Sequence, residues 1–289
     1  MKILELENFE PAFFLNKSAD TNSTSVYIHL MLGQTLAIAR NTFREAVRDR
    51  VLYNLILFAL LLIGSAIFIG ELSAGQEAKI VVDLGLSAML LFGAFIAIFV
   101  GVGLVYKEIE RRTLYAILSK PIGRGQFLFG KYLGLNLTLL VNVVVMGIGV
   151  MLALLYTRGS VDPLIFKIWP AILLIYFELL MLTAVAILFS SFSSPALSAL
   201  LSFFVFVIGH FSNDLRALSE SAASTPARWV FRALYYVLPN FSNLSAITAT
   251  AHGMNPDART VAGAIAYGAL YAAALLSAAA LIFRRRNFK

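Results

Sequence analysis

The sequence predicts an all-α integral membrane protein with six transmembrane helices. Of its 289 residues, 60% are hydrophobic and only 13% are charged, whereas soluble domains are about half apolar and a quarter charged. The apolar residues form long uninterrupted runs, and a helix needs about 20 such residues to cross the hydrocarbon layer. Strands of a membrane barrel would instead alternate over about 10 residues. Because backbone polar groups in lipid must be satisfied within their own segment, these runs predict helices.

The apolar runs divide the chain into a leading tail, a transmembrane domain and a basic end. Residues 1–27 are polar and mixed and are predicted to form a cytoplasmic tail, and residues 284–289 form a basic cytoplasmic tail. The transmembrane domain covers residues 51–283, with an outer segment at 212–259 between spans five and six. The predicted spans are 51–70, 80–105, 132–156, 164–189, 196–211 and 260–283.

Residues 28–50 predict an amphipathic interfacial helix. Apolar side chains recur there at the helical period, and three arginines follow one another at four-residue spacing beside them. Long arginine side chains in such a row can reach lipid headgroups. We therefore expect this helix to lie along the membrane surface before the first span. The residues are Leu36, Ala39, Phe43 and Val47 in the apolar stripe and Arg40, Arg44 and Arg48 in the row.

The distribution of lysine and arginine predicts the orientation of the chain. Of the 21 basic residues beyond the leading tail, fourteen lie on the side that holds the ends of the transmembrane domain and the 106–131 loop, against seven on the other side. Such an excess marks the cytoplasmic side of a membrane protein. Both termini are therefore predicted to be cytoplasmic, which requires an even number of spans. The net charge of +7 reflects this topology and not a surface for nucleic acid.

The sequence has no motif for making or breaking covalent bonds. The segment 125–132, GQFLFGKY, matches GxxxxGK of a phosphate-binding loop, but a tyrosine replaces the Ser or Thr that must reach magnesium. There is no cysteine, and His29, His210 and His252 are far apart in the sequence, which favours ordinary interfacial histidines over a metal site. We therefore expect no catalytic residue, no cofactor and no bound metal.

Glu178 is the one acidic residue near the middle of a predicted span. An ionised carboxylate there costs about 2.5–3.5 kcal/mol, so its side chain should face protein, water or a partner. It either lines a translocation path or locks helices together, or it packs against Asn142 or Asn136 of the preceding span. The sequence alone leaves these interpretations open.

Small residues recur at four-residue spacing on two predicted spans. Such faces let helix backbones approach closely. Each face either packs within one subunit or forms the seam of a dimer. The two faces are Gly93, Ala97 and Gly101, and Ala264, Gly268 and Ala272.

The 106–131 loop is unusually long and dense in charge for a connection between two spans. Its pattern is helical up to Lys120 and is then broken by Pro121 and Gly123. A connection that only reversed the chain would not need an apolar face on a charged helix. The loop is therefore either a second surface-lying helix or a docking helix for a cytoplasmic partner. The apolar edge consists of Leu114, Ile117 and Leu118.

Several short motifs occur in a fixed order in this loop, in the outer segment and at the end of the chain. They are Lys107-Glu108-Ile109-Glu110, Thr113-Leu114, Leu118-Ser119-Lys120-Pro121, Arg124, Gly130-Lys131, Tyr235-Tyr236-Val237-Leu238-Pro239-Asn240 and the stretch from Ala266 to Arg286. Together with the predicted topology, this set resembles the permease subunits of ABC-2 type ATP-binding cassette transporters. The nearest branch is the one grouped with copper-enzyme maturation and gliding-motility permeases. Arg111 and Arg112 depart from many relatives, which have a smaller residue there.

The resemblance implies a connecting helix before span one, a coupling helix between spans two and three, and a homodimer or heterodimer of six-span subunits. It also implies two separate ATP-binding cassette ATPase subunits on the cytoplasmic face, outward transport, and a place in the bacterial inner membrane. The residues that it implies for ATPase coupling are Glu108, Glu110, Arg112, Thr113, Leu114, Leu118, Pro121 and Arg124.

Two other functions stay open from the sequence. One is an ATP-independent carrier or channel that uses Glu178, with Asn142 as a second polar position on the path. The other is a membrane scaffold that transports nothing. The favoured hypothesis is a permease subunit without an ATPase site of its own.

Overall fold

The structure of the chain is a computed structural model and consists of helices and the connections between them. The residues that the structure describes are 21–73, 75–110, 123–159, 163–221, 224–254 and 256–285. No strand occurs in these ranges, so the predicted all-α membrane fold is confirmed. The elements are α1 (Thr21–Val47), α2 (Arg50–Glu71), α3 (Glu77–Glu110), α5 (Arg124–Arg158), α6 (Pro163–Lys167), α7 (Trp169–Ser190), α8 (Pro195–His210), α9 (Ser212–Ser221), α10 (Thr225–Val237), η2 (Ser242–Leu244), α11 (Ile247–Ala251) and α12 (Ala258–Arg285).

Five helices within the described ranges are long and apolar enough to cross a membrane: α2, α3, α5, α7 together with α6, and α12. A sixth crossing results only if α8 and α9, which are bent by 65° relative to each other, count as one span. α8 has 16 residues, or about 24 Å at 1.5 Å per residue, less than the roughly 30 Å of hydrocarbon. The chain thus bends at Phe211 and does not extend the fifth span straight past His210.

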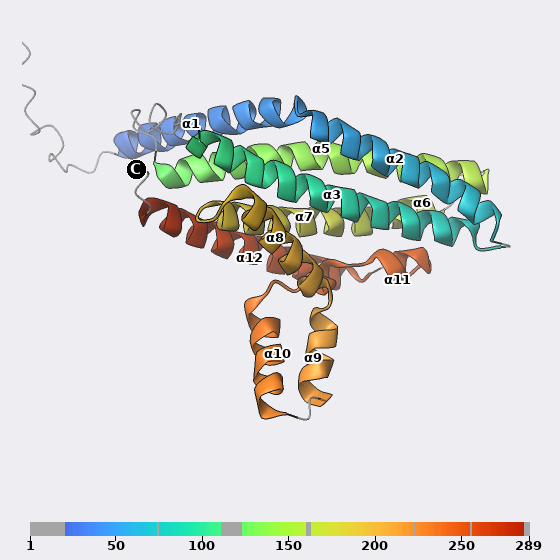
Figure 1. Ribbon diagram of the computed structural model, residues 1–289. Helices are drawn as coiled ribbons and strands as arrows, with labels where there is room; N and C mark the ends of the chain where they lie inside the picture. Colours follow the sequence, from blue (N-terminus) through green and yellow to red (C-terminus); the bar gives the residue numbers. More distant parts are fainter. Residues whose placement is uncertain are drawn as a thin grey trace, which may run out of the picture.

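The long helices run side by side in one bundle (Figure 1). α3 and α7 form its centre, since 72% and 67% of their most apolar windows are buried, against 22% for α2 and 17% for α12. We name the end that holds Glu110, Arg124 and Arg285 the Arg124 end. The opposite end, where α3 starts and α5 stops, is the Arg158 end (Figure 1).

α3 and α5 extend well beyond the spans predicted for them. They have 34 and 35 residues, or about 51 and 53 Å at 1.5 Å per residue. Residues 106–110 therefore belong to α3 and residues 124–131 to α5, which corrects the prediction of one connecting loop over 106–131. Only residues 111–122 remain between the two helices, and they lie outside the described residues.

The predicted amphipathic helix corresponds to α1, which starts and ends earlier than the expected range of 28–50. α1 follows the first half of α5 along the bundle, with α2 continuing beyond it (Figure 1). The break between them is set by Asp49, whose Oδ1 accepts a hydrogen bond of 3.0 Å from the backbone of Val51 and caps α2. The position of α1 on the membrane surface stays a prediction.

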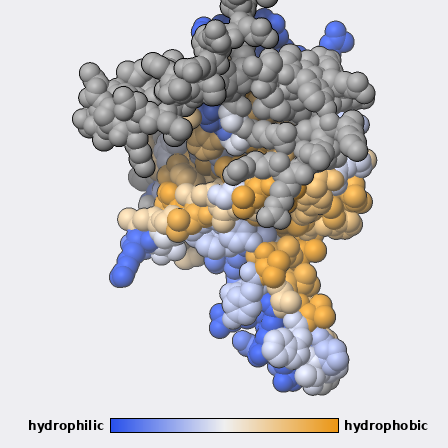
Figure 2. Space-filling view, turned by 90° about the vertical axis from the view of Figure 1, so that its left-hand side faces the viewer, coloured by the Kyte–Doolittle hydropathy of each residue, from blue (hydrophilic) through white to orange (hydrophobic). Residues whose placement is uncertain are grey.

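The outer segment contains a helical hairpin of α9 and α10. α10 is amphipathic and pairs with α9, and the hairpin stands out from the side of the bundle (Figure 1). Figure 2 shows hydrophobic residues on one side of the hairpin and hydrophilic ones on the other side and at the tip. After the hairpin, η2 and α11 return along the bundle to α12.

Candidate functional site

The residues predicted to couple the chain to an ATPase lie on both sides of residues 111–122. Glu108 and Glu110 belong to the last turn of α3, and Arg124 is the first residue of α5, so the fold brings their backbones to the same end of the bundle (Figure 1). The remaining predicted coupling residues, Arg112, Thr113, Leu114, Leu118 and Pro121, lie outside the described residues.

A close contact between α1 and α5 lies directly beside this end. A Cβ atom added to Gly134 would lie 2.4 Å from the backbone oxygen of Ala39 and 2.6 Å from the Cβ of Thr42. One added to Gly130 would lie 2.7 Å from Ile38 Cγ2. Both glycines are therefore needed for α1 to approach the backbone of α5. The sequence signal for this contact is the GxxxG spacing of Gly130 and Gly134, which lets helix backbones touch.

Polar contacts add to the contact of α1 with α5. Lys131 is 2% exposed, and its Nζ lies 3.4 Å from Glu45 Oε2 and 5.7 Å from the centre of the Phe127 ring. The lysine of the GxxxxGK match is thus a helix-packing residue paired with α1. Gln126 links the same helices, because its Nε2 donates to the backbone oxygen of Met31 at 3.4 Å while its Oε1 accepts from the backbone of Gly123 at 3.1 Å. The start of α5 is therefore tied to α1 immediately after residues 111–122.

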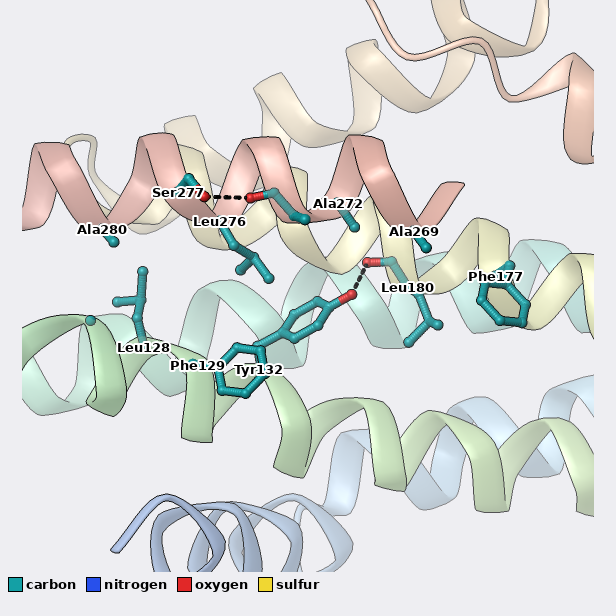
Figure 3. A pocket seen from close by; sticks show the side chains of 12 residues that line it. Leu128, Phe129, Tyr132, Phe177, Leu180, Ala269, Ala272, Leu276, Ser277 and Ala280 are labelled. Carbon is teal, nitrogen blue, oxygen red and sulfur yellow. Dashed lines mark hydrogen bonds between the residues drawn. The ribbon is translucent and has the colours of Figure 1, made fainter. Parts of the chain in front are cut away.

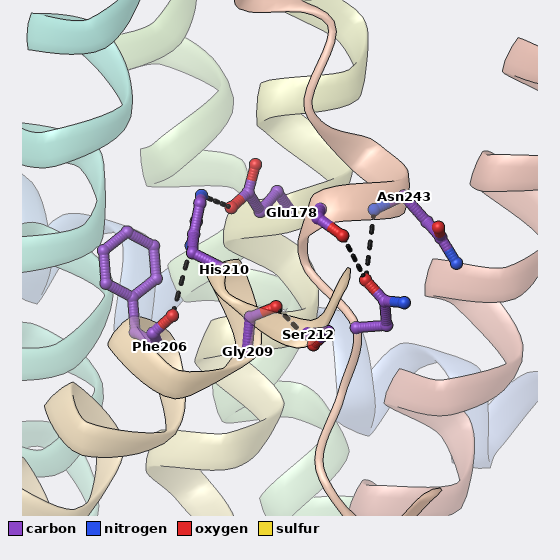
Figure 4. Close-up of polar contacts among 8 residues, drawn as sticks. Glu178, Phe206, Gly209, His210, Ser212 and Asn243 are labelled. Carbon is purple, nitrogen blue, oxygen red and sulfur yellow. Dashed lines mark hydrogen bonds and ion pairs between the residues drawn. The ribbon is translucent and has the colours of Figure 1, made fainter. Parts of the chain in front are cut away.

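Glu178 is fully buried near the middle of α7 and meets His210, the last residue of α8 (Figure 4). The distance from His210 Nε2 to Glu178 Oε1 is 3.0 Å. The carboxylate therefore pairs with His210 and not with Asn142 or Asn136, the partners considered from the sequence. Imidazole and carboxyl can share one proton and stay neutral as a pair, which lowers the cost of burial compared with a lone carboxylate.

His210 is held in place by aromatic rings and by the start of the returning segment. Its ring lies 4.6 Å from that of Phe206 and stacks at 5.8 Å on that of Phe241. Its Nδ1 lies 3.1 Å from the backbone oxygen of Phe206 (Figure 4). Gly209 has no room for a side chain, since an added Cβ would lie 2.5 Å from Phe241 and from the Pro239 oxygen. The residues after the hairpin thus fix the end of α8.

Two tyrosines of α12 anchor the same returning segment. The hydroxyl of Tyr271 donates to the backbone oxygen of Val237 at 2.7 Å, and that of Tyr267 accepts from the backbone of Asn240 at 2.9 Å. Asn240 Oδ1 then accepts from Ser242 and Asn243 at 2.7 and 3.3 Å and caps η2. The polar cluster around Glu178 therefore joins α7, α8 and the base of the hairpin, with α12 holding the segment that follows. The sequence contained no periodic signal for this contact between α7, α8 and the segment that follows the hairpin.

Both predicted small-residue faces pack within the subunit. A Cβ on Gly93 would lie 2.6 Å from Leu179 of α7, and Gly101 faces Leu135 and Ala186. Gly268 of α12 faces Leu244 of η2, with a buried alanine one turn away on each side. The alternative that one of these faces forms the seam of a dimer is therefore wrong.

An apolar groove of about 420 Å³ lies between α5, α7 and α12 (Figure 3). Phe129, Leu180 and several alanines of α12 line it. Its two hydroxyl groups already have partners: Tyr132 donates to the Leu180 oxygen at 3.3 Å, and Ser277 donates to the Ala273 oxygen at 2.8 Å. The lining residues offer no unused side-chain group that would mark a polar substrate.

Comparison with known proteins places the chain in a family. Residues 36–286 match the family described as ABC-2 family transporter protein. Over 208 residues the chain is 31% identical to the probable ABC transporter permease protein NosY of Pseudomonas aeruginosa, which covers 70% of this chain and 67% of the relative. It is 30% identical over 119 residues to the protein of the same name from Stutzerimonas stutzeri, covering 39% and 43%. The chain therefore belongs to the ABC-2 family of transporter proteins and is an ABC transporter permease.

Proposed function

We propose that the chain is the permease of an exporter driven by a separate cytoplasmic ATP-binding cassette ATPase. The ATPase docks on the segment from residue 106 to residue 131, which includes the ends of α3 and α5. The observation that carries the proposal is the contact of Gly130 and Gly134 with α1. It ties the start of α5 to the helix before the first span, immediately beside the segment that would receive the ATPase.

The lengths of α3 and α5 support transmission of movement from the docked ATPase into the bundle. Each helix runs without interruption from the Arg124 end through the bundle, so a push on residues 111–122 would tilt both as rigid rods. α1 would follow α5, because their backbones are in contact and Lys131 is paired with Glu45. ATPase closure can bias the permease between two arrangements only if the docked ATPase has different affinities for them.

The docking surface is tested by replacing Leu114 and Leu118 with Asp. The double variant should lose co-purification with the ATPase and lose stimulation of ATP hydrolysis in liposomes, because charges would replace the apolar edge. The matched control is Leu72→Asp, since Leu72 is 88% exposed and lies after α2 at the Arg158 end. Full coupling in the double variant would remove the docking assignment.

A second permease subunit is supported by the depth of the hairpin. The hairpin leaves the bundle after His210, which contacts Glu178. Glu178 lies nine residues after Trp169, the first residue of α7, which is roughly 13 Å along the helix. The hairpin carries five charged residues, each of which costs about 2.5–3.5 kcal/mol at the centre of a bilayer. We infer that the hairpin faces a second copy or a water-filled space between two copies. The charged residues are Asp214, Arg216, Glu220, Arg228 and Arg232.

We also propose that the Arg124 end is cytoplasmic, in the bacterial inner membrane, with both termini on that side. The excess of fourteen basic residues over seven, counted from the sequence for the two sides of the membrane, supports this orientation. A cysteine at position 115 tests it cleanly, because the chain has none of its own. A membrane-impermeant maleimide should label the Tyr115→Cys variant in inside-out vesicles and not in intact cells. The reverse pattern would overturn the orientation.

For Glu178 we propose the role of a lock between α7 and α8. Full burial and the pairing with His210 favour a lock over a residue that lines a path. Asn142, buried on α5 with its Nδ2 unbonded within the described residues, is the second polar position that could take part. An ATP-independent carrier predicts transport by the purified chain in liposomes without ATP, abolished by Glu178→Gln. A scaffold predicts ATP hydrolysis that never changes the conformation of the membrane domain.

A further inference from the structure

A polar hollow of about 630 Å³ lies at the Arg158 end of the bundle. Segments that are distant in the sequence surround it: the turn from α2 into α3, the last residues of α5 and α6, and the end of α11 (Figure 1). Its charged lining consists of Lys79, Arg158, Lys167 and Glu77, with the imidazole of His252 beside them. The hollow is separate from the Glu178 cluster and from the predicted coupling segment.

The hollow has an excess of positive charge. Among the described lining residues, Lys79 and Lys167 face the single carboxylate of Glu77, which leaves one positive charge in excess with His252 neutral, and Arg158 lies beside them with a partner of its own. Lys79 and Lys167 are half-buried, and neither forms an ion pair with any residue in the described ranges. Like charges held around one space repel each other. A bound anion would remove that repulsion.

The convergence of these cations is not explained by the overall distribution of charge. Apart from the hairpin, the Arg158 end carries only four basic residues, Lys79, Arg158, Lys167 and Arg259. Three of these four line the same hollow. The gathering of most of the scarce positive charge at one place points to a ligand and not to a generally solvated surface.

The first turn of α3 adds a further preference for anions. α3 has 34 residues and begins at Glu77, and the start of a helix carries a partial positive charge and unpaired backbone N–H groups. Gln76 and Ala78 line the hollow beside this turn. The Glu77 carboxylate offsets part of the helix field, and the two charges of Lys79 and Lys167 exceed the one that it neutralises.

The hollow lies at the level expected for lipid headgroups. Tyr156, Phe166 and Trp169 are exposed close to its lining residues Arg158 and Lys167 in the chain. Aromatic side chains of this kind gather at the boundary between membrane and water. A phosphate group of a lipid headgroup would therefore reach the lysines without leaving the membrane surface.

We propose that this hollow binds a phosphate group, held by Lys79 and Lys167. Each lysine binds phosphate as a point charge with three N–H donors. The group could belong to an anionic lipid or to free phosphate, and the experiment below separates these two sources. The proposal does not depend on the ATPase docking surface or on the direction of transport.

The test measures binding of phosphatidylglycerol and of phosphatidylcholine to the purified full chain by native mass spectrometry. Wild type should bind phosphatidylglycerol more tightly than phosphatidylcholine. The Lys79→Gln/Lys167→Gln variant should lose at least about tenfold in affinity, since each lost bond to a charged group removes a factor of roughly ten or more. Lys79→Arg/Lys167→Arg should retain binding. The matched control is Arg228→Gln/Arg232→Gln, which removes two cations from the hairpin and should leave affinity unchanged.

A parallel titration with inorganic phosphate, followed by ³¹P NMR, identifies the source. Saturable binding of inorganic phosphate that the Lys79→Gln/Lys167→Gln variant loses would assign free phosphate. Loss confined to phosphatidylglycerol would assign the lipid headgroup. If the variant binds both ligands as tightly as wild type, the proposal is overturned. The single variants Lys79→Gln and Lys167→Gln, each expected to weaken binding about tenfold, decide the outcome if the double variant is unstable.

Discussion

Glu178 and His210 illustrate how two ionisable residues can stay inside a helical bundle. They approach to 3.0 Å, and the rings of Phe206 and Phe241 cover the imidazole. Neither carboxylate oxygen has a hydrogen-bond donor in good alignment among the described residues, so the 3.0 Å approach of His210 is the charge contact that compensates the carboxylate. The pair is therefore stable only as a unit: removal of His210 would leave a buried carboxyl group with no partner.

We expect the two residues to behave as a coupled pair in a double-mutant cycle. His210→Leu should lower the free energy of unfolding by about 3–5 kcal/mol, because it leaves one partner of a buried pair alone. Glu178→Leu/His210→Leu should cost less than the sum of the single changes, by about 0.5–3 kcal/mol. Denaturation of the purified chain in mixed micelles measures all of these values.

The control cycle combines His210→Leu with Asn142→Leu. Asn142 lies on α5 and forms no hydrogen bond with His210 in the structure, so these two changes should add. Strict additivity for Glu178 and His210 as well would mean that their contact contributes nothing to the lock.

At the scale of helices, α1 and α5 form the closest contact described near the Arg124 end. Gly130 and Gly134 remove side chains where α1 crosses, and Lys131 and Gln126 then add polar bonds to the same helix. The amphipathic pattern predicts that α1 exists and is half-buried. It does not predict what covers its apolar stripe, because lipid and α5 are equally apolar partners.

Gly134→Ala should weaken this contact selectively. The added methyl group would lie 2.4 Å from the Ala39 oxygen, and overpacking of this kind costs about 1–3 kcal/mol. The matched control is Gly64→Ala in α2, where an added Cβ meets nothing within 4 Å. That control should be neutral or stabilise by up to about 1 kcal/mol through helix propensity. Thermal unfolding in detergent compares the two, and equal stability would mean that α1 can move away at no cost.

At the scale of the whole molecule, the bundle exposes two very different sides. α2 presents apolar side chains such as Leu57, Phe58 and Leu61 to its surroundings, as a face toward lipid should. The hairpin on the opposite side presents Trp229 and Tyr236 together with charged residues (Figures 1 and 2). Such a mixed surface is typical of the rim of a protein interface, and hydrocarbon could not solvate it.

Cross-linking tests whether this side meets a second copy. Trp229→Cys introduces one thiol into a chain without cysteine, at a side chain that is 68% exposed. A bis-maleimide should yield a covalent dimer in membranes, because a two-fold interface brings the same surface of both copies together. The control is Phe58→Cys on α2, which is 58% exposed in the wild type and should remain monomeric. Failure of Trp229→Cys, Val230→Cys and Tyr236→Cys alike would exclude the hairpin from the interface.

The sequence by itself determined the fold class, the existence of α1, and the approximate place of each apolar span, because these follow from hydrophobic runs and helical period. It also singled out Glu178, since a carboxylate within a span is costly wherever it points. The resemblance that it carried to ABC-2 permeases is confirmed by the family match.

Only the tertiary structure decided which residues contact one another. His210 lies 32 positions after Glu178 in the chain, and their contact requires α8 to stop short and the chain to bend by 65°. The same holds for Lys131 with Glu45 and for the cations that converge at the Arg158 end. Hydrophobic periodicity fixes how a helix is oriented toward apolar surroundings. Periodicity does not say whether another helix, lipid or a polar group contacts a given face of the helix. Those contacts depend on packing between segments far apart in the chain.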